Sequence, residues 1–231
     1  DAGGGDPGPR GTRGSTVHYS LPYGYWTLGA TLSESRYYQN VTGLTQDYVY
    51  SGTSGNAELK LSRLFYRDAT RKSTAYVKAF ERHSNNYVDD TEVQIQRRVV
   101  GGWEFGLGHK EFLGSATLDA NVAYKRGTRD FAAMDAPEEA TGQGTARVGL
   151  WTADITLNQP FKWLGQSLRY QGNLRLQGND TPLTPQDRFG IGGRYTVRGF
   201  DGESSLSGDS GWLLRQELGW ALGSSGQEFD L

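Results

Sequence analysis

Residues 168–177 read LRYQGNLRLQ, and this stretch decides the fold. One set of alternate positions holds Leu168, Tyr170, Gly172, Leu174 and Leu176, and the other holds Arg169, Gln171, Asn173, Arg175 and Gln177. A period of two is typical of a β-strand with one apolar and one polar face. The stretch therefore predicts a strand that separates an apolar environment from water.

The same alternation recurs along most of the chain. Apolar stripes begin at Trp26, Ala75, Ala116 and Trp212, and a less regular one runs from Glu92 to Val99, where Arg97 interrupts it. About ten such strands are expected, each long enough to cross a bilayer, which takes about 9–11 residues. Short links near residues 22–24, 68–72, 112–114 and 160–165 alternate with longer ones near 127–144, 178–186 and 194–211. Short turns at one end and long loops at the other predict an all-β, antiparallel transmembrane β-barrel.

The composition agrees with strands and turns. The chain has 231 residues, with 33 Gly, 13 Tyr and 6 Trp, and its mean hydropathy of -0.63 reflects many polar residues. A barrel can be this polar, because the residues that face its interior are hydrated. The net charge of -2 gives no basic surface for nucleic acid, and the lack of cysteine excludes disulfides and thiolate sites. Residues 1–14 are expected to be a loop, with no apolar signal segment.

A soluble β-sandwich or carbohydrate-binding β-protein is the main alternative, because its strands also alternate. Aromatic residues gather at the expected strand ends, for example Tyr23, Tyr25, Tyr37 and Tyr38. Such girdles lie at the two membrane interfaces of a barrel. The aromatic ends and the unequal loops therefore favour the membrane barrel.

From Asp187 the chain reads DRFGIGGRYTVRGFDGESSLSGDSGWLLRQEL. The segment Val197-Arg198-Gly199-Phe200, with its flanking glycines, resembles the signature segment of TpsB transporters of two-partner secretion. Residues 19–26, 36–38 and 61–67 are similar to the early barrel hairpins of that family. The resemblance thus extends over nearly the whole chain.

The resemblance implies a partial barrel over residues 15–231, with about ten strands of a sixteen-stranded parent. It implies that residues 194–211 form a loop folded into the barrel lumen, and that POTRA domains, a plug helix and the last strands belong to other parts of the protein. The implied function is secretion of a TpsA-type exoprotein across the outer membrane of a Gram-negative bacterium, by a monomeric barrel in contact with lipid. A BamA-like assembly factor shares the VRGF element and is the alternative within the superfamily.

The expected site residues form three groups. Arg198 is expected to pair with an acidic residue on the inner wall, because its guanidinium forms bidentate pairs with carboxylates. The resemblance places that acid beyond Leu231, and Glu217, Asp119 and Asp154 are the candidates within the chain. The loop motif is Val197, Arg198, Gly199 and Phe200, and its expected supports are Phe189, Gly190, Ile191, Gly192, Gly193, Gly208 and Asp209. The expected lumen lining is Lys78, Arg82, Gln94, Gln96, Arg169, Gln171, Asn173, Arg175, Arg215 and Glu217.

No enzyme motif is recognisable. His18, His83 and His109 are the only histidines, and none stands at a metal-ligand spacing. A barrel phospholipase would need a Ser/His pair on the outer face near the membrane edge, and we expect each histidine to be an isolated polar residue of a strand. No catalytic residue, metal or cofactor is predicted.

Overall fold

The computed structural model describes residues 11–42, 47–193, 196–197, 205–221 and 228–230. In chain order the strands are β1 (Arg13–Tyr23), β2 (Trp26–Thr42), β3 (Asp47–Arg67), β4 (Arg71–Val88), β5 (Thr91–Glu92), β6 (Arg98–Leu113), β7 (Ala116–Thr128), β8 (Gly149–Trp163), β9 (Gln166–Asn179), β10 (Phe189–Ile191), β11 (Leu206–Gly208), β12 (Gly211–Ala221) and β13 (Glu228–Asp230). Two 3₁₀ helices, η1 (Gln94–Gln96) and η2 (Pro137–Thr141), lie between strands.

One antiparallel sheet contains nearly all of these strands, in the order β1-β2-β3-β4-β6-β7-β8-β9-β12-β13, with β5 paired to β4. The separate pair β10–β11 is also antiparallel. The all-β antiparallel fold predicted from the alternation is confirmed, and ten strands on the main path agree with the expected number. Within the described ranges, no helix is long and apolar enough to cross a membrane.

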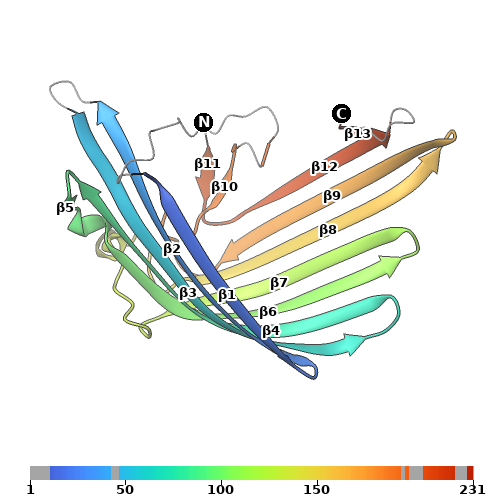
Figure 1. Ribbon diagram of the computed structural model, residues 1–231, viewed down its shortest axis with the longest axis horizontal. Coiled ribbons are helices and arrows are strands. Elements are labelled where there is room, and N and C mark those ends of the chain that lie inside the picture. Colours follow the sequence, from blue (N-terminus) through green and yellow to red (C-terminus); the bar gives the residue numbers. More distant parts are fainter. Residues whose placement is uncertain (1–10, 43–46, 194–195, 198–204, 222–227, 231) are drawn as a thin grey trace.

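The connections are unequal at the two ends of the sheet. The links between β1 and β2, β6 and β7, and β8 and β9 are two residues each, whereas β7 and β8 are separated by residues 129–148 and β9 and β12 by residues 180–210. Figure 1 shows the tight turns along one edge of the curved sheet and the long connections along the other. This is the asymmetry that the sequence predicted.

The sheet curls into an open trough, and the β10–β11 hairpin lies inside the curve (Figure 1). Large apolar side chains remain exposed on the strands, among them Leu32, Phe105, Leu107 and Val122. The one cluster of buried apolar side chains is small and consists of Val148, Leu150 and Leu183, in the described part of the chain. Because exposed apolar surface of this extent is unfavourable in water, the strands need an apolar partner outside the chain.

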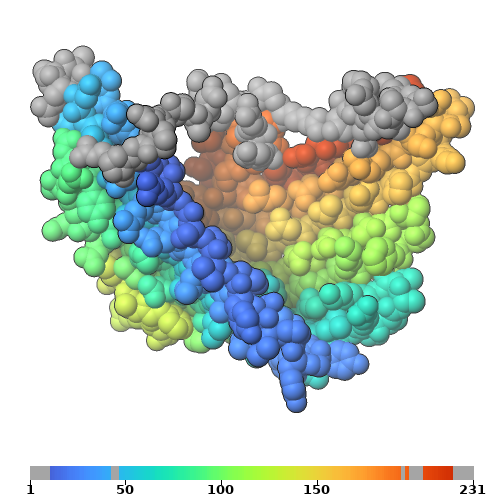
Figure 2. Space-filling view, viewed as in Figure 1, coloured from blue at the N-terminus to red at the C-terminus, as the bar shows by residue number. Residues whose placement is uncertain are grey.

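The alternation assigns the two faces. Lys125, from the polar stripe of β7, contacts Asp187 of the segment that leads into the hairpin, so the polar stripe faces the concave side. Its neighbours Tyr124 and Val122 therefore face the convex side, as alternate residues of a strand must. Figure 2 shows the hollow of the trough, with the orange residues around the hairpin within it. We call the polar inner face the concave wall.

Two sequence predictions need correction. The strand expected from Glu92 to Val99 is wrong: β5 ends at Glu92, Gln94 and Gln96 lie in η1, and β6 begins at Arg98. Asp89 and Asp90, with φ angles of 47° and 64°, form the turn from β4 into β5, which pairs with β4 only at Thr91 and Glu92. The Gln96 amide then donates to the Val93 carbonyl, and the chain continues as η1 and not as a strand. In addition, β1 begins at Arg13, within residues 1–14 that were expected to form a loop.

Candidate functional site

Charged side chains on β3, β4 and β6 form a connected group on the concave wall. The Lys78 ammonium lies 3.1 Å from Glu104 and 3.7 Å from Glu58. The Tyr76 hydroxyl donates to Glu104 over 2.7 Å, and the Lys60 ammonium lies 3.9 Å from the centre of the Tyr76 ring. In these pairs each charged group on the concave wall has a partner of opposite charge, a hydroxyl or an aromatic ring.

A second polar group lies on β8, β9 and β12. Arg175 Nε is 3.4 Å from Asp154, and Arg215 Nε donates to Glu217 over 2.7 Å. Gln171, Asn173, Arg215 and Glu217 line one small cavity of about 120 Å³. Arg82 lies four residues from Lys78 on β4, and Arg169 lies six residues from Arg175 on β9, so both arginines share the concave face with them. The structure therefore places eight of the ten expected lining residues on the concave wall.

Gln94 and Gln96 are not strand residues of that wall, although Gln96 binds Tyr50 and Asn86, which occupy concave positions of β3 and β4. Both lie in η1, between β5 and β6, and Gln96 accepts hydrogen bonds from the Tyr50 hydroxyl (2.9 Å) and the Asn86 amide (2.8 Å). Their assignment to the middle of a strand was wrong, because the alternating apolar residues around them do not continue a ladder. Gln96 instead helps to fix the connection between β4 and β6.

The β10–β11 hairpin carries most of the expected loop supports. Phe189 is buried, and its ring lies so close to Gly211 that a Cβ on that glycine would come within 2.6 Å of the ring. The Arg175 guanidinium lies 5.7 Å from the centre of the same ring. Phe189 pairs with Gly208 across the hairpin, and Ile191 pairs with Leu206. An aromatic side chain thus seats the hairpin on the concave wall at the start of β12.

A tight turn follows the hairpin strand β10. The Thr196 hydroxyl accepts from the Gly192 amide over 3.0 Å and donates to the Gly193 carbonyl over 2.8 Å. The amides of Thr196 and Val197 also donate to the Gly193 carbonyl. Gly192 has a φ of 106°, a conformation that a side chain would strain. Both glycines therefore have a local structural role in this turn.

Two aspartates, Asp187 and Asp209, flank the β10–β11 hairpin and anchor it. The Lys125 ammonium donates to Asp187 over 2.7 Å, although 62 residues separate them. Asp209 accepts from the Leu183 amide (3.2 Å) and from Arg188 Nε (3.1 Å). The Gln177 side chain donates to the main-chain carbonyls of both aspartates, at 2.9 Å and 3.1 Å. The base of the expected signature loop is thereby fixed to β7 and β9.

The signature residues Arg198, Gly199 and Phe200 lie outside the described residues. Val197 is described, and with Thr196 it lines a cavity of about 290 Å³ that also borders Arg215 and Glu217. Of the three acids proposed as partners of Arg198, Glu217 alone lines this cavity among the described residues. Asp154 contacts Arg175, and Asp119 accepts from the Asn121 amide over 3.1 Å.

The connection from β7 to β8 is held by two arginines. Arg98 donates two hydrogen bonds to the Glu138 carboxylate, one of 2.7 Å. Arg147 donates to both Asp135 and Glu139, over 2.7 Å in each case. The bonds from Arg98 hold the pKa of Glu138 below its ordinary value of 4.5. This connection is therefore an ordered structure at neutral pH.

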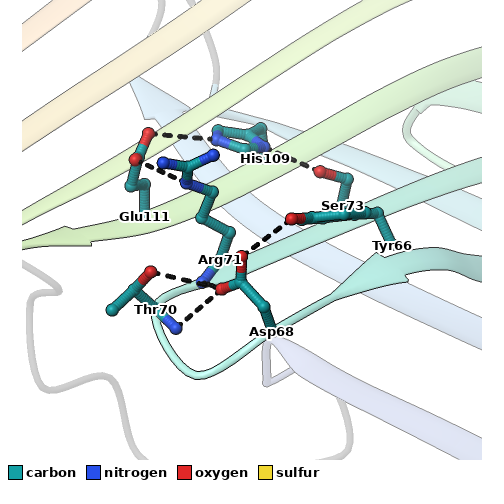
Figure 3. Close-up of polar contacts among 7 residues, drawn as sticks. All are labelled: Tyr66, Asp68, Thr70, Arg71, Ser73, His109 and Glu111. Carbon is teal, nitrogen blue, oxygen red and sulfur yellow. Dashed lines mark hydrogen bonds and ion pairs between the residues drawn. The ribbon is translucent and has the colours of Figure 1, made fainter.

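A polar network lies near the turn between β3 and β4 (Figure 3). Asp68 accepts from the Thr70 amide and from the Tyr66 hydroxyl, each over 2.8 Å, and these bonds lower its pKa to about 2. Arg71 Nε donates to Glu111 over 2.9 Å. This network closes the turn and satisfies the polar groups beside it.

Ser73 and His109 belong to the same network. Ser73 Oγ lies 2.7 Å from His109 Nδ1, and His109 Nε2 lies 3.5 Å from Glu111. Both residues alternate with Tyr76 and Glu104 of the concave wall, so they face the convex side. Ser73 is 8% exposed, and Glu111 also binds Arg71. The expectation that each histidine is isolated was wrong: His109 has these partners, His18 Nδ1 lies 2.8 Å from Thr31 Oγ1, and His83 Nδ1 lies 3.7 Å from Glu81.

Sequence reasoning did not single out Lys125 or Asp187 as a pair. The alternation of β7 puts Lys125 on the polar face, and Asp187 opens the signature stretch, but nothing in the sequence relates the two. Within the described ranges, no group of three or more His, Asp or Glu side chains is arranged to hold a metal ion.

Comparison with known proteins gives consistent matches. The chain is 31% identical over 208 residues to the outer membrane transporter CdiB-2 of Burkholderia pseudomallei, which covers 90% of this chain and 36% of the relative. It is 27% identical over 221 residues to the hemolysin transporter protein ShlB of Serratia marcescens, covering 92% and 38%. The chain thus spans little more than a third of the length of these relatives.

The structure of CdiB from Acinetobacter baumannii matches with a TM-score of 0.82 and 34% identity, covering 94% of this chain and 38% of that one. The model of the family described as haemolysin secretion/activation protein ShlB/FhaC/HecB matches residues 2–231. The resemblance to TpsB transporters predicted from the sequence is therefore confirmed: the chain belongs to the ShlB/FhaC/HecB family of haemolysin secretion and activation proteins.

Proposed function

We propose that this chain forms part of the wall of an outer-membrane pore that secretes a partner exoprotein from a Gram-negative bacterium. The observation that carries the proposal is the division of one curved sheet into an apolar convex face and a charged concave wall, with the β10–β11 hairpin inside the curve. A lipid-facing exterior and a hydrated interior are what a transmembrane barrel requires. The curated relatives named above are transporters, and one of them is a hemolysin transporter, which favours secretion over barrel assembly or carbohydrate binding.

The chain supplies about ten strands of a barrel of about sixteen, and the complete barrel acts as a monomer surrounded by lipid. A closed barrel has no unpaired edge, which is the condition for a sheet to be stable in hydrocarbon. The concave wall offers charges of both signs and several amides, so an unfolded polypeptide can pass without binding tightly at one point. No step requires bond-making by the protein, and we propose no catalytic, metal or cofactor role for any residue.

Within this pore, Arg198 is the residue that keeps the signature loop against the inner wall, through a bidentate pair with a carboxylate. The cavity shared by Val197, Arg215 and Glu217 supports this placement, because it brings the start of the motif to the wall of β12. Gly199 and Phe200 then shape and seat the tip of the loop. Residues 194–211 are the lumenal loop of the transporter in this proposal.

The test is secretion by the full-length protein expressed with its exoprotein. Arg198→Ala should reduce the exoprotein in the medium at least tenfold while the amount of heat-modifiable barrel in the outer membrane stays unchanged. Arg36→Ala, which removes an exposed arginine of β2, is the matched control and should secrete normally. Normal secretion by Arg198→Ala would disprove the role of that residue, and failure of the unmodified protein to enter the outer membrane would disprove the pore.

A further inference from the structure

The Lys125–Asp187 pair joins two parts of the molecule that the sheet itself keeps apart. Lys125 belongs to β7, and its row across the sheet continues through Leu150 of β8 to Asn179 of β9. Asp187 follows β9 and reaches back over that row to the lysine. The pair therefore holds the start of the signature segment across two strands of the concave wall.

Both charged groups are withdrawn from solvent. The side chains of Lys125 and Asp187 are 16% and 11% exposed, and their atoms are 2.7 Å apart. The Lys125 ammonium also lies 5.1 Å from the centre of the Phe80 ring on β4. Asp187 is held on its own side by the Thr184 hydroxyl at 3.3 Å. A charge-assisted bond with this burial and support is stronger than an exposed ion pair.

Asp187 is the acidic partner of Lys125 because the carboxylate opposite it on the sheet is bound by other residues. The register partner of Lys125 on β6 is Glu104, but Glu104 is bound by Lys78 and by the Tyr76 hydroxyl. The group consists of the three cations Lys60, Lys78 and Lys125 and the three carboxylates Glu58, Glu104 and Asp187. Asp187 is the one member contributed by the loop. Within this group the positive and negative charges balance only when Asp187 is included.

We propose that Lys125 and Asp187 form a latch that holds the base of the signature segment on the concave wall and keeps the pore narrow at rest. Lys125 is a positioning residue: it acts on transport through the loop and not by contact with the exoprotein. The inference rests on the proposed pore function. The resting conductance of the pore then depends on one ion pair between β7 and the base of the loop.

The experiment measures ion current through the full-length protein in planar bilayers, together with secretion in cells. Asp187→Asn and Lys125→Met should each raise the mean resting current several-fold, because the loop base is released. The charge-exchanged variant Lys125→Asp/Asp187→Lys should return the current toward that of the unmodified protein. Glu34→Gln, which neutralises an exposed acid paired with Arg36 on β2, is the matched control and should leave the current unchanged.

Resting currents of both single variants equal to that of the unmodified protein would overturn the latch, as would an exchanged variant that conducts like the single ones. If a single variant fails to assemble, the resting current of the charge-exchanged variant tests the latch, because that variant keeps both charges. Failure of the exchanged variant to assemble also counts against the latch. Absence of any current or secretion from the unmodified protein would contradict the pore and not the latch, so the two failures are distinguishable.

Discussion

At the scale of the residue, Gly127 is a position where the main chain leaves no room for a side chain. A Cβ added to Gly127 would lie 2.1 Å from the Ala146 carbonyl oxygen and 2.8 Å from the Val148 amide nitrogen. Both atoms belong to the main chain, so a change of rotamer cannot remove the clash. Gly127 also donates its amide to the Val148 carbonyl over 2.8 Å, which extends the pairing of β7 beyond the end of β8.

We predict that Gly127→Ala destabilises the barrel by about 1–3 kcal/mol, the range observed when a packed site receives an extra methyl group. The measurement is the temperature at which the folded form disappears in heat-modifiable gel migration. Gly178→Ala is the control, because a Cβ there meets nothing within 4 Å. Equal loss of stability in the two variants would show that the close approach at Gly127 is not what restricts it.

At the scale of the element, the connection from β7 to β8 is ordered by carboxylates. The pKa of Glu138 is lowered mainly by the hydrogen bonds from Arg98. For Glu139, burial acts to raise the pKa, but hydrogen bonds from the Thr145 hydroxyl and the Ala146 amide outweigh it and leave the pKa lowered. The ionised forms are thus favoured by the folded connection.

A group whose pKa is lowered by folding stabilises the fold above its ordinary pKa and loses that contribution as the pH falls through the lowered value. We predict that the protection of amides in residues 129–148, measured relative to the intrinsic exchange rate at each pH, decreases below about pH 4.5, the ordinary value for Glu138. Glu138→Gln should speed exchange already at neutral pH, since a hydrogen bond to a charged group contributes about 1.5–3 kcal/mol. It should also weaken the pH dependence, although Glu139 remains. A variant with unchanged exchange at both pH values would contradict this account.

At the scale of the whole molecule, the two faces of the sheet have opposite requirements. Val122 lies on the convex face of β7 and is 45% exposed, whereas its neighbour Asn121 lies on the concave wall and donates to Asp119. An arginine on the lipid face of a barrel costs about 2–4 kcal/mol at the midplane. An arginine beside Asp119 and Asp154 meets compensating charge instead.

We therefore predict that Val122→Arg reduces the amount of folded barrel in the outer membrane several-fold, and that Asn121→Arg, one residue away, assembles normally. Fractionation of membranes followed by heat-modifiable migration measures both. If Asn121→Arg were the variant that fails, the assignment of the two faces would be reversed. Both variants introduce arginine into the same strand, so a difference in assembly between them reflects the face and not the strand propensity of arginine.

Much of this architecture was predictable because alternation and turn length are local properties of the chain. The pleat alone puts Arg169, Gln171, Asn173 and Arg175 on one face, and the short links marked the hairpins correctly. The same reasoning failed between β4 and β6. There the alternation of Val93, Ile95 and Val99 suggested a strand. The structure has the 3₁₀ helix η1 instead, in which the Gln96 amide bonds the Val93 carbonyl and the Gln96 side chain bonds Tyr50 and Asn86.

Local sequence patterns were enough to assign the strands, their apolar and polar faces and the ends that carry long loops, and the stretch from Asp187 onward was enough to assign the family. Only the tertiary structure decided where those loops go: Phe189 against Gly211, Glu138 on Arg98, and Asp187 on Lys125 across 62 residues. The physical reason is that a strand's faces follow from the geometry of successive residues, whereas the path of a loop depends on partners distant in the chain, which no local pattern specifies.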